Sequence, residues 1–117
     1  MAYFLSTGGN NTSTSTDFTS SVTFVGSVGS YTHFYIRDGV VYLSYQGYAG
    51  TYAANDTLFT LPSGYRPVAV MSVPFVLNNS AYGVVNFNSS TGVCKIDFIS
   101  NSSAEGRVYF NVAYPIA

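Results

Sequence analysis

Short runs of alternating apolar and polar residues, each ended by Gly, Pro, Asn or Ser, fill most of this chain after its first segment. Alternation with a period of two places successive side chains on opposite faces of a β-strand, whereas an amphipathic helix needs apolar residues at i, i+3 and i+4. The helical spacing is not sustained anywhere in the sequence. We therefore expect an all-β fold, a small antiparallel β-sandwich or barrel of about eight strands.

The clearest β-hairpin spans residues 32–46, where Asp38-Gly39 separates two alternating runs. Asp-Gly supplies the two positive-φ positions of a type I′ turn, and a two-residue turn fixes the register of the flanking strands. That register puts Ile36 opposite Val41 and Phe34 opposite Leu43 on the core face. The other face then carries Arg37, Tyr35 and His33 opposite Val40, Tyr42 and Ser44.

Other runs bounded by turn residues predict further strands, at residues 18–25, 58–61, 68–77, 82–88, 93–100 and 107–114. Two of them alternate cleanly and should each have one wet face. The inward residues are predicted to be Cys94, Ile96 and Phe98 in one, and Val108, Phe110 and Val112 in the other.

The run at residues 68–77 is apolar at nearly every position, so both of its faces should be covered by protein. Either another subunit covers one face, or the run is a central strand of a sandwich. Pro74 cannot donate to a strand ladder, and it therefore predicts a bulge, a bend or an edge position within this run.

The length and composition favour one packed domain. A chain of 117 residues with 47% hydrophobic and 17% aromatic residues can bury one hydrophobic core. Residues 1–17 contain mostly Ser, Thr, Asn and Gly after the first few positions, which favours a flexible lead-in or connector. Residues 18–117 are expected to form a single β-sandwich or barrel head domain.

Charge and cysteine content argue against several classes of partner. The net charge is −1 and the four cations are scattered, so nucleic acid is not an expected partner. No apolar window is long enough for a membrane helix, and residues 1–5 lack the pattern of a signal peptide. One Cys and one His offer no metal-ligand set, and we expect neither a metal nor a cofactor.

Little in the sequence suggests catalysis, because there is a single His and no recognised nucleophile motif. Glycoside hydrolysis would require two carboxylates to meet across a cleft. The candidates are Asp17, Asp38, Asp56, Asp97 and Glu105. Turns, loops and outward strand positions explain most of them better, so we expect a non-enzymatic domain.

Saccharide binding is better represented, because sugars pack their C–H faces on aromatic rings and need hydrogen-bond donors and acceptors for their hydroxyls. The outer face of the first hairpin gathers such side chains, and it is our first candidate for a saccharide-contacting or subunit-contacting surface. Its members are His33, Tyr35, Arg37, Tyr42, Ser44 and Gln46. The alternative is an ordinary cross-strand Tyr35–Tyr42 pair beside solvated neighbours.

A second candidate is the expected loop at residues 47–57, which carries Tyr48, Tyr52, Asn55 and Asp56. Loops on a rigid sheet often carry recognition. The alternative is a long connection whose tyrosines fold back onto the core.

The phrase L-P-S-G-Y-R-P at residues 61–67, with the strand before it, the apolar run after it and the S-T-G-V-C-K-I hairpin at residues 90–96, resembles the C-terminal receptor-binding heads of phage tail fibres and baseplate proteins. The resemblance is to heads from phages of Gram-positive hosts, and it covers about half of the chain. Physically, the phrase fits a strand end, a Pro-Gly turn and a second Pro before the next strand.

The resemblance implies a homotrimeric head at the tail tip or baseplate of a virion that adheres to saccharides of the host cell envelope. It carries over no particular binding residue. It would also explain the apolar run at residues 68–77, if that run lies near a threefold axis. The sequence has no stalk repeat, so we expect an isolated head joined to an upstream fibre or baseplate region. A structural module that binds another virion protein and a small polysaccharide depolymerase tip are the alternatives.

Overall fold

The structure is a computed structural model that describes residues 14–78, 81–103 and 105–116. Within these ranges the regular structure is almost entirely β, which confirms the predicted all-β, antiparallel class. One turn of 3-10 helix, Thr19–Ser21, accompanies ten strands. The strands are β1 Thr16–Asp17, β2 Thr23–Phe24, β3 Ser27–Val28, β4 His33–Arg37, β5 Val40–Thr51, β6 Thr57–Thr60, β7 Met71–Leu77, β8 Ala81–Phe87, β9 Val93–Ile99 and β10 Glu105–Pro115.

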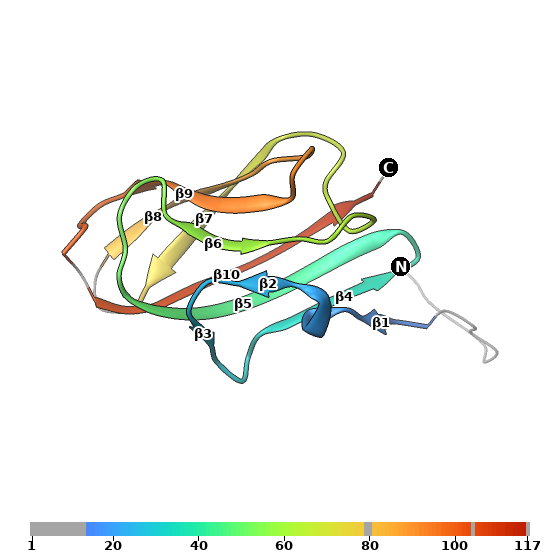
Figure 1. Ribbon diagram of the computed structural model, residues 1–117, viewed down its shortest axis with the longest axis horizontal. Helices are drawn as coiled ribbons and strands as arrows, with labels where there is room; N and C mark the ends of the chain where they lie inside the picture. Colours follow the sequence, from blue (N-terminus) through green and yellow to red (C-terminus); the bar gives the residue numbers. More distant parts are fainter. Residues whose placement is uncertain (1–13, 79–80, 104, 117) are drawn as a thin grey trace, which may run out of the picture.

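The strands form one curled sheet that makes a half-barrel, in the order β1-β4-β5-β10-β7-β8-β9-β6-β2 (Figure 1). β2 and β3 follow each other in the chain but pair with different parts of this sheet. β2 pairs with β6, and β3 pairs with the second half of β5. The segment at residues 23–28 therefore bridges the open side of the half-barrel.

The N-terminal connector predicted at residues 1–17 lies mostly outside the described residues. Its last two residues form β1, which pairs with β4 through Thr16↔Ile36 and Asp17↔Tyr35. The sheet thus begins one strand earlier than the sequence pattern indicates.

The first hairpin has the predicted turn and register. Asp38 and Gly39 have φ values of 52° and 76°, as a type I′ turn requires. The pairs run from His33↔Ser44 to Arg37↔Val40, with Phe34 opposite Leu43 between them. The hairpin therefore presents an apolar face to the interior and a polar-aromatic face to the outside.

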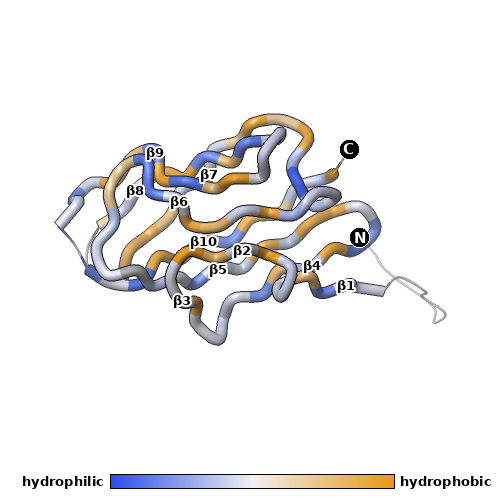
Figure 2. The backbone as a smooth tube through the Cα atoms, in the orientation of Figure 1, coloured by the Kyte–Doolittle hydropathy of each residue, from blue (hydrophilic) through white to orange (hydrophobic). Residues whose placement is uncertain are grey.

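Aromatic rings fill the centre of the half-barrel. Phe59 is fully buried, and its ring centroid lies 5.0 Å from that of Phe34, 5.0 Å from that of Tyr45 and 5.9 Å from that of Phe87. Figure 2 shows that hydrophobic positions recur along the long strands rather than gathering in one segment. Each strand thus contributes alternate residues to one shared core.

The apolar run at residues 68–77 differs from its prediction. Only Met71–Leu77 forms a strand, and Val73, Phe75 and Leu77 are buried while the intervening residues are exposed. Among the described residues, this chain therefore covers one face of β7, and cover of the other face by another subunit stays a prediction. β7 pairs with β8 over its whole length but with β10 only at Val76 and Leu77, so Pro74 has no partner on the β10 side. Pro74 therefore occupies an edge position. Its missing N–H predicted a bulge, a bend or an edge, and the structure shows the last of these.

In strand β9 the predicted inward direction of Phe98 is wrong. The β8–β9 register shifts, since Val84 pairs with Phe98 but Val85 pairs with Ile96, which leaves Asp97 as an extra residue. A β-bulge of this kind turns the following side chain to the opposite face. Phe98, predicted inside, is 49% exposed and lies beside Tyr82 with 6.3 Å between the ring centroids. In β10 the predicted alternation holds, with Val108 and Phe110 buried.

Candidate functional site

The polar-aromatic face of the first hairpin continues onto a third strand. β10 pairs with β5 on the side away from β4, with Ala113 opposite Tyr42 and Asn111 opposite Ser44. Tyr42 and Ser44 in turn lie opposite Tyr35 and His33. Three strands therefore present one continuous outer surface, in which a row of larger side chains meets a row of smaller ones.

Three aromatic rings are neighbours on this surface. The rings of Tyr35 and Tyr42 are stacked, with centroids 4.9 Å apart and an angle of 16° between the planes. The His33 ring also lies beside that of Tyr35, with the ring centroids 4.8 Å apart. The predicted cross-strand aromatic pair therefore exists, and its stacking restricts both tyrosine side chains before any ligand arrives.

A groove of about 400 Å³ runs beside this row. One face of the Tyr42 ring is occupied by Tyr35, whereas the neighbour of Tyr42 on β10 is Ala113, which carries only a methyl group. The small residue leaves room that a longer side chain would fill. The described residues that line the groove are Tyr35, Tyr42, Leu43, Ser44, Asn111, Val112 and Ala113.

Polar groups lie on the groove without a charge among them. The Ser44 hydroxyl donates to the Tyr31 carbonyl oxygen at 3.0 Å and can still accept a hydrogen bond, and the Asn111 side chain is exposed. None of the described lining residues is ionisable except the two tyrosines. The groove thus offers an aromatic wall, a hydroxyl and an amide to a neutral ligand.

A contact between His33 and Asp17 fixes one end of the surface. His33 Nε2 lies 3.0 Å from Asp17 Oδ2, and Asp17 Oδ1 accepts a hydrogen bond from the Thr19 backbone N–H at 2.8 Å. That N–H, followed by the Thr19 hydroxyl and the His33 contact, lowers the pKa of Asp17 below its usual value. Both side chains in this contact are more than half exposed, so the contact orients His33 more than it stabilises the fold. Arg37 is exposed at the other end of β4, where it lies opposite Val40 next to the turn.

The second predicted candidate, the loop at residues 47–57, is largely strand. β5 continues to Thr51, and Tyr48 lies on its outer face with the guanidinium carbon of Arg107 4.7 Å from its ring centroid. Tyr52 is only 2% exposed and belongs to the core. For Tyr52 the predicted surface role is wrong, and the alternative that a tyrosine folds back onto the core is correct.

Asn55 and Asp56 hold the turn that follows. Asn55 has a φ of 75° and donates its N–H to the Ile96 carbonyl oxygen at 2.6 Å, and Asp56 Oδ2 accepts from the Ala53 N–H at 2.8 Å. This turn packs against β9, whereas the groove lies on β4, β5 and β10. The structure therefore does not bring the two predicted candidate regions into one site.

Gln46 is buried, although the sequence pattern places it on the outer face of the first hairpin. It is 5% exposed, its Nε2 donates to the Tyr109 hydroxyl at 3.1 Å, and its Oε1 accepts from the Tyr31 N–H at 3.4 Å. The segment that leads into β4 covers it, as the bond from the Gly29 N–H to the Gln46 carbonyl oxygen shows. Gln46 therefore ties that segment to the sheet rather than meeting solvent.

Sequence reasoning missed Asn111 and Ala113 as groove residues. The alternation of β10 predicts that Asn111 points outward, but nothing in the sequence gives the pairing of β10 with β5. Asp17 was considered only as a candidate for catalysis, and its contact with His33 depends on the unpredicted β1–β4 pairing.

The five carboxylates occupy separate elements. Asp17 is on β1, Asp38 is in the β4–β5 turn, Asp56 is in the β5–β6 turn, Asp97 is on β9 and Glu105 begins β10. Among the described residues, no Asp or Glu lines the groove, and no group of three or more His, Cys, Asp or Glu side chains could hold a metal ion.

Within the described ranges, no helix is long and apolar enough to cross a membrane. No protein-family model matches the chain, and no curated protein is significantly similar to it in sequence.

Proposed function

We propose that this domain is a non-catalytic saccharide-binding head that holds a neutral sugar in the groove between Tyr42 and Ala113. The observation that carries the proposal is the uncovered side of the Tyr42 ring beside the Ser44 hydroxyl and the Asn111 amide. A pyranose packs its apolar C–H face on an aromatic ring, and its hydroxyls exchange hydrogen bonds with amides and hydroxyls. The stacked Tyr35 supports the ring from behind, which reduces the entropy lost on binding.

We further propose that the domain is the receptor-recognising head of a phage tail fibre or baseplate protein, located at the virion tail tip, where it adheres to host cell-envelope saccharide. The support is the resemblance of the L-P-S-G-Y-R-P segment and of the residues that follow it to such heads. A virion module that binds another virion protein through the same tyrosine surface is the second candidate.

A homotrimer belongs to this proposal, and an exposed apolar patch supports it. Val76, Tyr82 and Phe98 are exposed by 55%, 61% and 49% and lie on the adjacent strands β7, β8 and β9. Patches of large exposed apolar side chains are typical of protein interfaces. Light scattering on the purified domain should give the mass of three chains, and Tyr82→Asp should reduce it to that of one. A wild-type protein that remains monomeric at high concentration would remove the trimer from the proposal.

The test of saccharide binding uses the domain on purified envelope polysaccharides and on a glycan array. Saturable binding is expected, and Ala113→Leu, which fills the groove without removing a polar group, should weaken it by about tenfold or more. Ala53→Leu makes the same change at an exposed alanine outside the groove and should leave binding unaltered.

Three results would contradict this function. Equal binding by the Ala113→Leu variant would place any saccharide elsewhere on the molecule. A folded wild-type domain that binds no envelope preparation would favour the virion-protein alternative. Release of reducing ends from a bound polysaccharide would favour the depolymerase.

A further inference from the structure

A second cavity, of about 490 Å³, lies at the end of the domain where β10 finishes. Three segments meet there: the β6–β7 connection, the turn between β8 and β9, and Ile116 just after β10. The lining consists of Ser63, Gly64, Arg66, Pro67, Val68, Ser89, Ser90 and Ile116. This cavity shares no described residue with the groove beside Tyr42, so an inference about it does not rest on the proposed function.

Contacts on several sides hold the β6–β7 connection in place. Tyr65 stacks on Phe18 with 3.9 Å between the ring centroids, and its carbonyl oxygen accepts a hydrogen bond from the Tyr114 hydroxyl. Pro67 pairs with Ile116 in an isolated β-bridge. The wall of the cavity is therefore formed before any ligand binds. This favours affinity, because binding costs little conformational entropy of the protein.

Arg66 is the only cation among the described lining residues, and it donates hydrogen bonds to two neutral carbonyl groups. Its Nε donates to the Leu61 carbonyl oxygen at 3.0 Å, and its Nη1 donates to the Ser90 carbonyl oxygen at 2.7 Å. A guanidinium has five N–H donors, so these bonds leave three for a ligand. No carboxylate is found among the described residues that line the cavity. The guanidinium is thus oriented by its neighbours, and none of the lining groups neutralises its charge.

The backbone around Arg66 has little room for change. Gly92 has a φ of 77°, and a Cβ added there would lie 2.6 Å from Arg66 Nε and 2.3 Å from the Leu61 carbonyl oxygen. A glycine at this position allows the guanidinium to reach both carbonyls.

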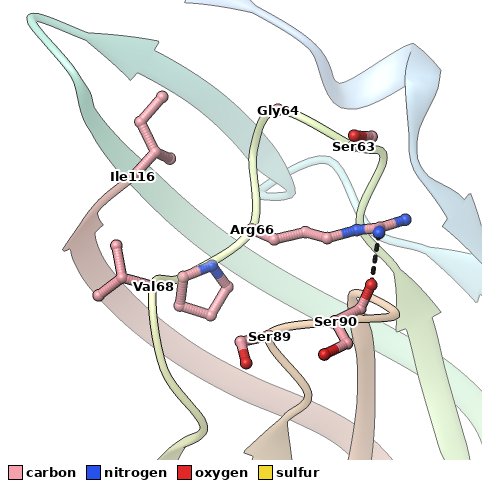
Figure 3. A pocket seen from close by; sticks show the side chains of 8 residues that line it. Ser63, Gly64, Arg66, Val68, Ser89, Ser90 and Ile116 are labelled. Carbon is pink, nitrogen blue, oxygen red and sulfur yellow. Dashed lines mark hydrogen bonds between the residues drawn. The ribbon is translucent and has the colours of Figure 1, made fainter.

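The two sides of the cavity differ in character. Figure 3 shows Ser63 and Ser90 near the guanidinium end of Arg66, with Val68 and Ile116 on the opposite side. Val68 is 60% exposed although it is apolar. Hydroxyls beside a fixed guanidinium suit an oxyanion, and the aliphatic side chains suit an apolar group attached to it.

We propose that this cavity is a second binding site, which takes a carboxylate or phosphate group that bears a small apolar substituent. The oxyanion accepts hydrogen bonds from the free N–H groups of Arg66 and from the neighbouring serine hydroxyls, while the substituent contacts Val68 and Ile116. The positive charge at the site makes binding weaker as the salt concentration rises.

The test is a titration of the isotope-labelled full chain followed by NMR, with sodium isobutyrate, sodium phosphate and neutral isobutyramide as separate probes. Saturable shifts are expected at the backbone amides of residues 63–66 and 89–92 and at Arg66 Nε–H, with an anion but not with isobutyramide. The tighter of the two anions identifies the oxyanion. Sodium acetate serves as a fourth probe, and tighter binding of isobutyrate than of acetate would show the contribution of the apolar side.

Matched variants avoid removing Arg66, whose loss could unfold the connection. Ser63→Asp places a carboxylate beside the guanidinium and should weaken anion binding by about tenfold or more, whereas Ser102→Asp, which adds the same charge at an exposed serine outside the cavity, should leave it within about twofold. Both should unfold at the wild-type urea midpoint or above it. Unchanged binding in Ser63→Asp, equal shifts with isobutyramide, or no saturable shift at these amides would each overturn the proposal.

Discussion

The β-bulge in β9 predicts unequal effects of two substitutions that strict alternation would treat alike. Ile96 is fully buried, and truncating a buried isoleucine to alanine removes its transfer free energy and leaves a cavity, at a cost of about 2–5 kcal/mol. Phe98 is 49% exposed, so Phe98→Ala forfeits about half of the roughly 1.5–3 kcal/mol that full burial of a phenylalanine contributes. We expect losses of folding free energy of about 3 kcal/mol for Ile96→Ala and about 1 kcal/mol for Phe98→Ala.

Urea unfolding followed by circular dichroism measures both losses. With a denaturant dependence of about 1.5 kcal/mol per molar urea, Ile96→Ala should lower the unfolding midpoint by about 2 M and Phe98→Ala by about 0.7 M. The titrations need several protein concentrations, because self-association through the exposed ring of Phe98 would make the wild-type midpoint rise with concentration.

The reasoning fails if Phe98→Ala lowers the midpoint as much as Ile96→Ala in dilute protein. That result would mean that Phe98 packs in the core and that β9 pairs with β8 without the extra residue at Asp97. A small effect of Ile96→Ala together with a large effect of Phe98→Ala would mean that the register of the whole strand differs by one residue from the one described.

Further predictions concern the backbone and the buried ionisable groups. Gly92→Ala should lose at least ~2 kcal/mol of stability, because its positive φ adds about 1–2 kcal/mol of strain and its Cβ would meet a backbone oxygen at 2.3 Å. Gly50→Ala has a similar φ of 86° but open space, so it should lose only the strain term, and equal urea midpoints for the two variants would contradict this account. Burial raises the pKa values of Cys94, Tyr45 and Tyr114 above their unfolded values of 9.0, 10.0 and 10.0. Since the folded state holds these protons more tightly, stability should be intact below pH 9 and should fall as the pH rises through about 9–11, as thermal unfolding across that range would show. The Cys94 thiol should react with a thiol reagent only as fast as the domain opens, and fast labelling of the native protein would mean that it is accessible.

The first hairpin shows how much local sequence can specify. Asp38-Gly39 permits only a tight turn with positive φ values, and the alternation on both sides leaves one register that buries Phe34 and Leu43 together. Both determinants lie within fifteen residues, so no distant part of the chain was needed to predict the pairing. The outward direction of His33, Tyr35, Tyr42 and Ser44 followed from it.

Elsewhere the same alternation was insufficient. Phe98 has the spacing of a core residue, but one extra residue in β9 reverses its direction, and a bulge depends on how the partner strand is placed. Tyr52 follows a strand that is longer than its turn-like composition suggests, because β5 continues to Thr51 in its pairing with β10, and Gly47 and Tyr48 also pair with β3. Composition alone assigned these residues to a loop.

The candidate groove divides in the same way. Its aromatic wall, Tyr35 and Tyr42, came from the hairpin register, whereas its other side, Asn111 and Ala113, comes from a strand about 70 residues later in the chain. Side-chain alternation says which residues of β10 point outward but is silent about which strand lies beside them.

The sequence by itself determined the all-β class, the approximate positions of most strands and the polar-aromatic face of the first hairpin, because these depend on alternation and turn chemistry between near neighbours. Only the tertiary structure decided which strands pair across the sheet, that Ala113 leaves the Tyr42 ring uncovered, and that Arg66 is held between two carbonyls beside a cavity. Those features depend on contacts between segments far apart in the chain, where burial of a shared core selects one arrangement among many that satisfy the same local pattern.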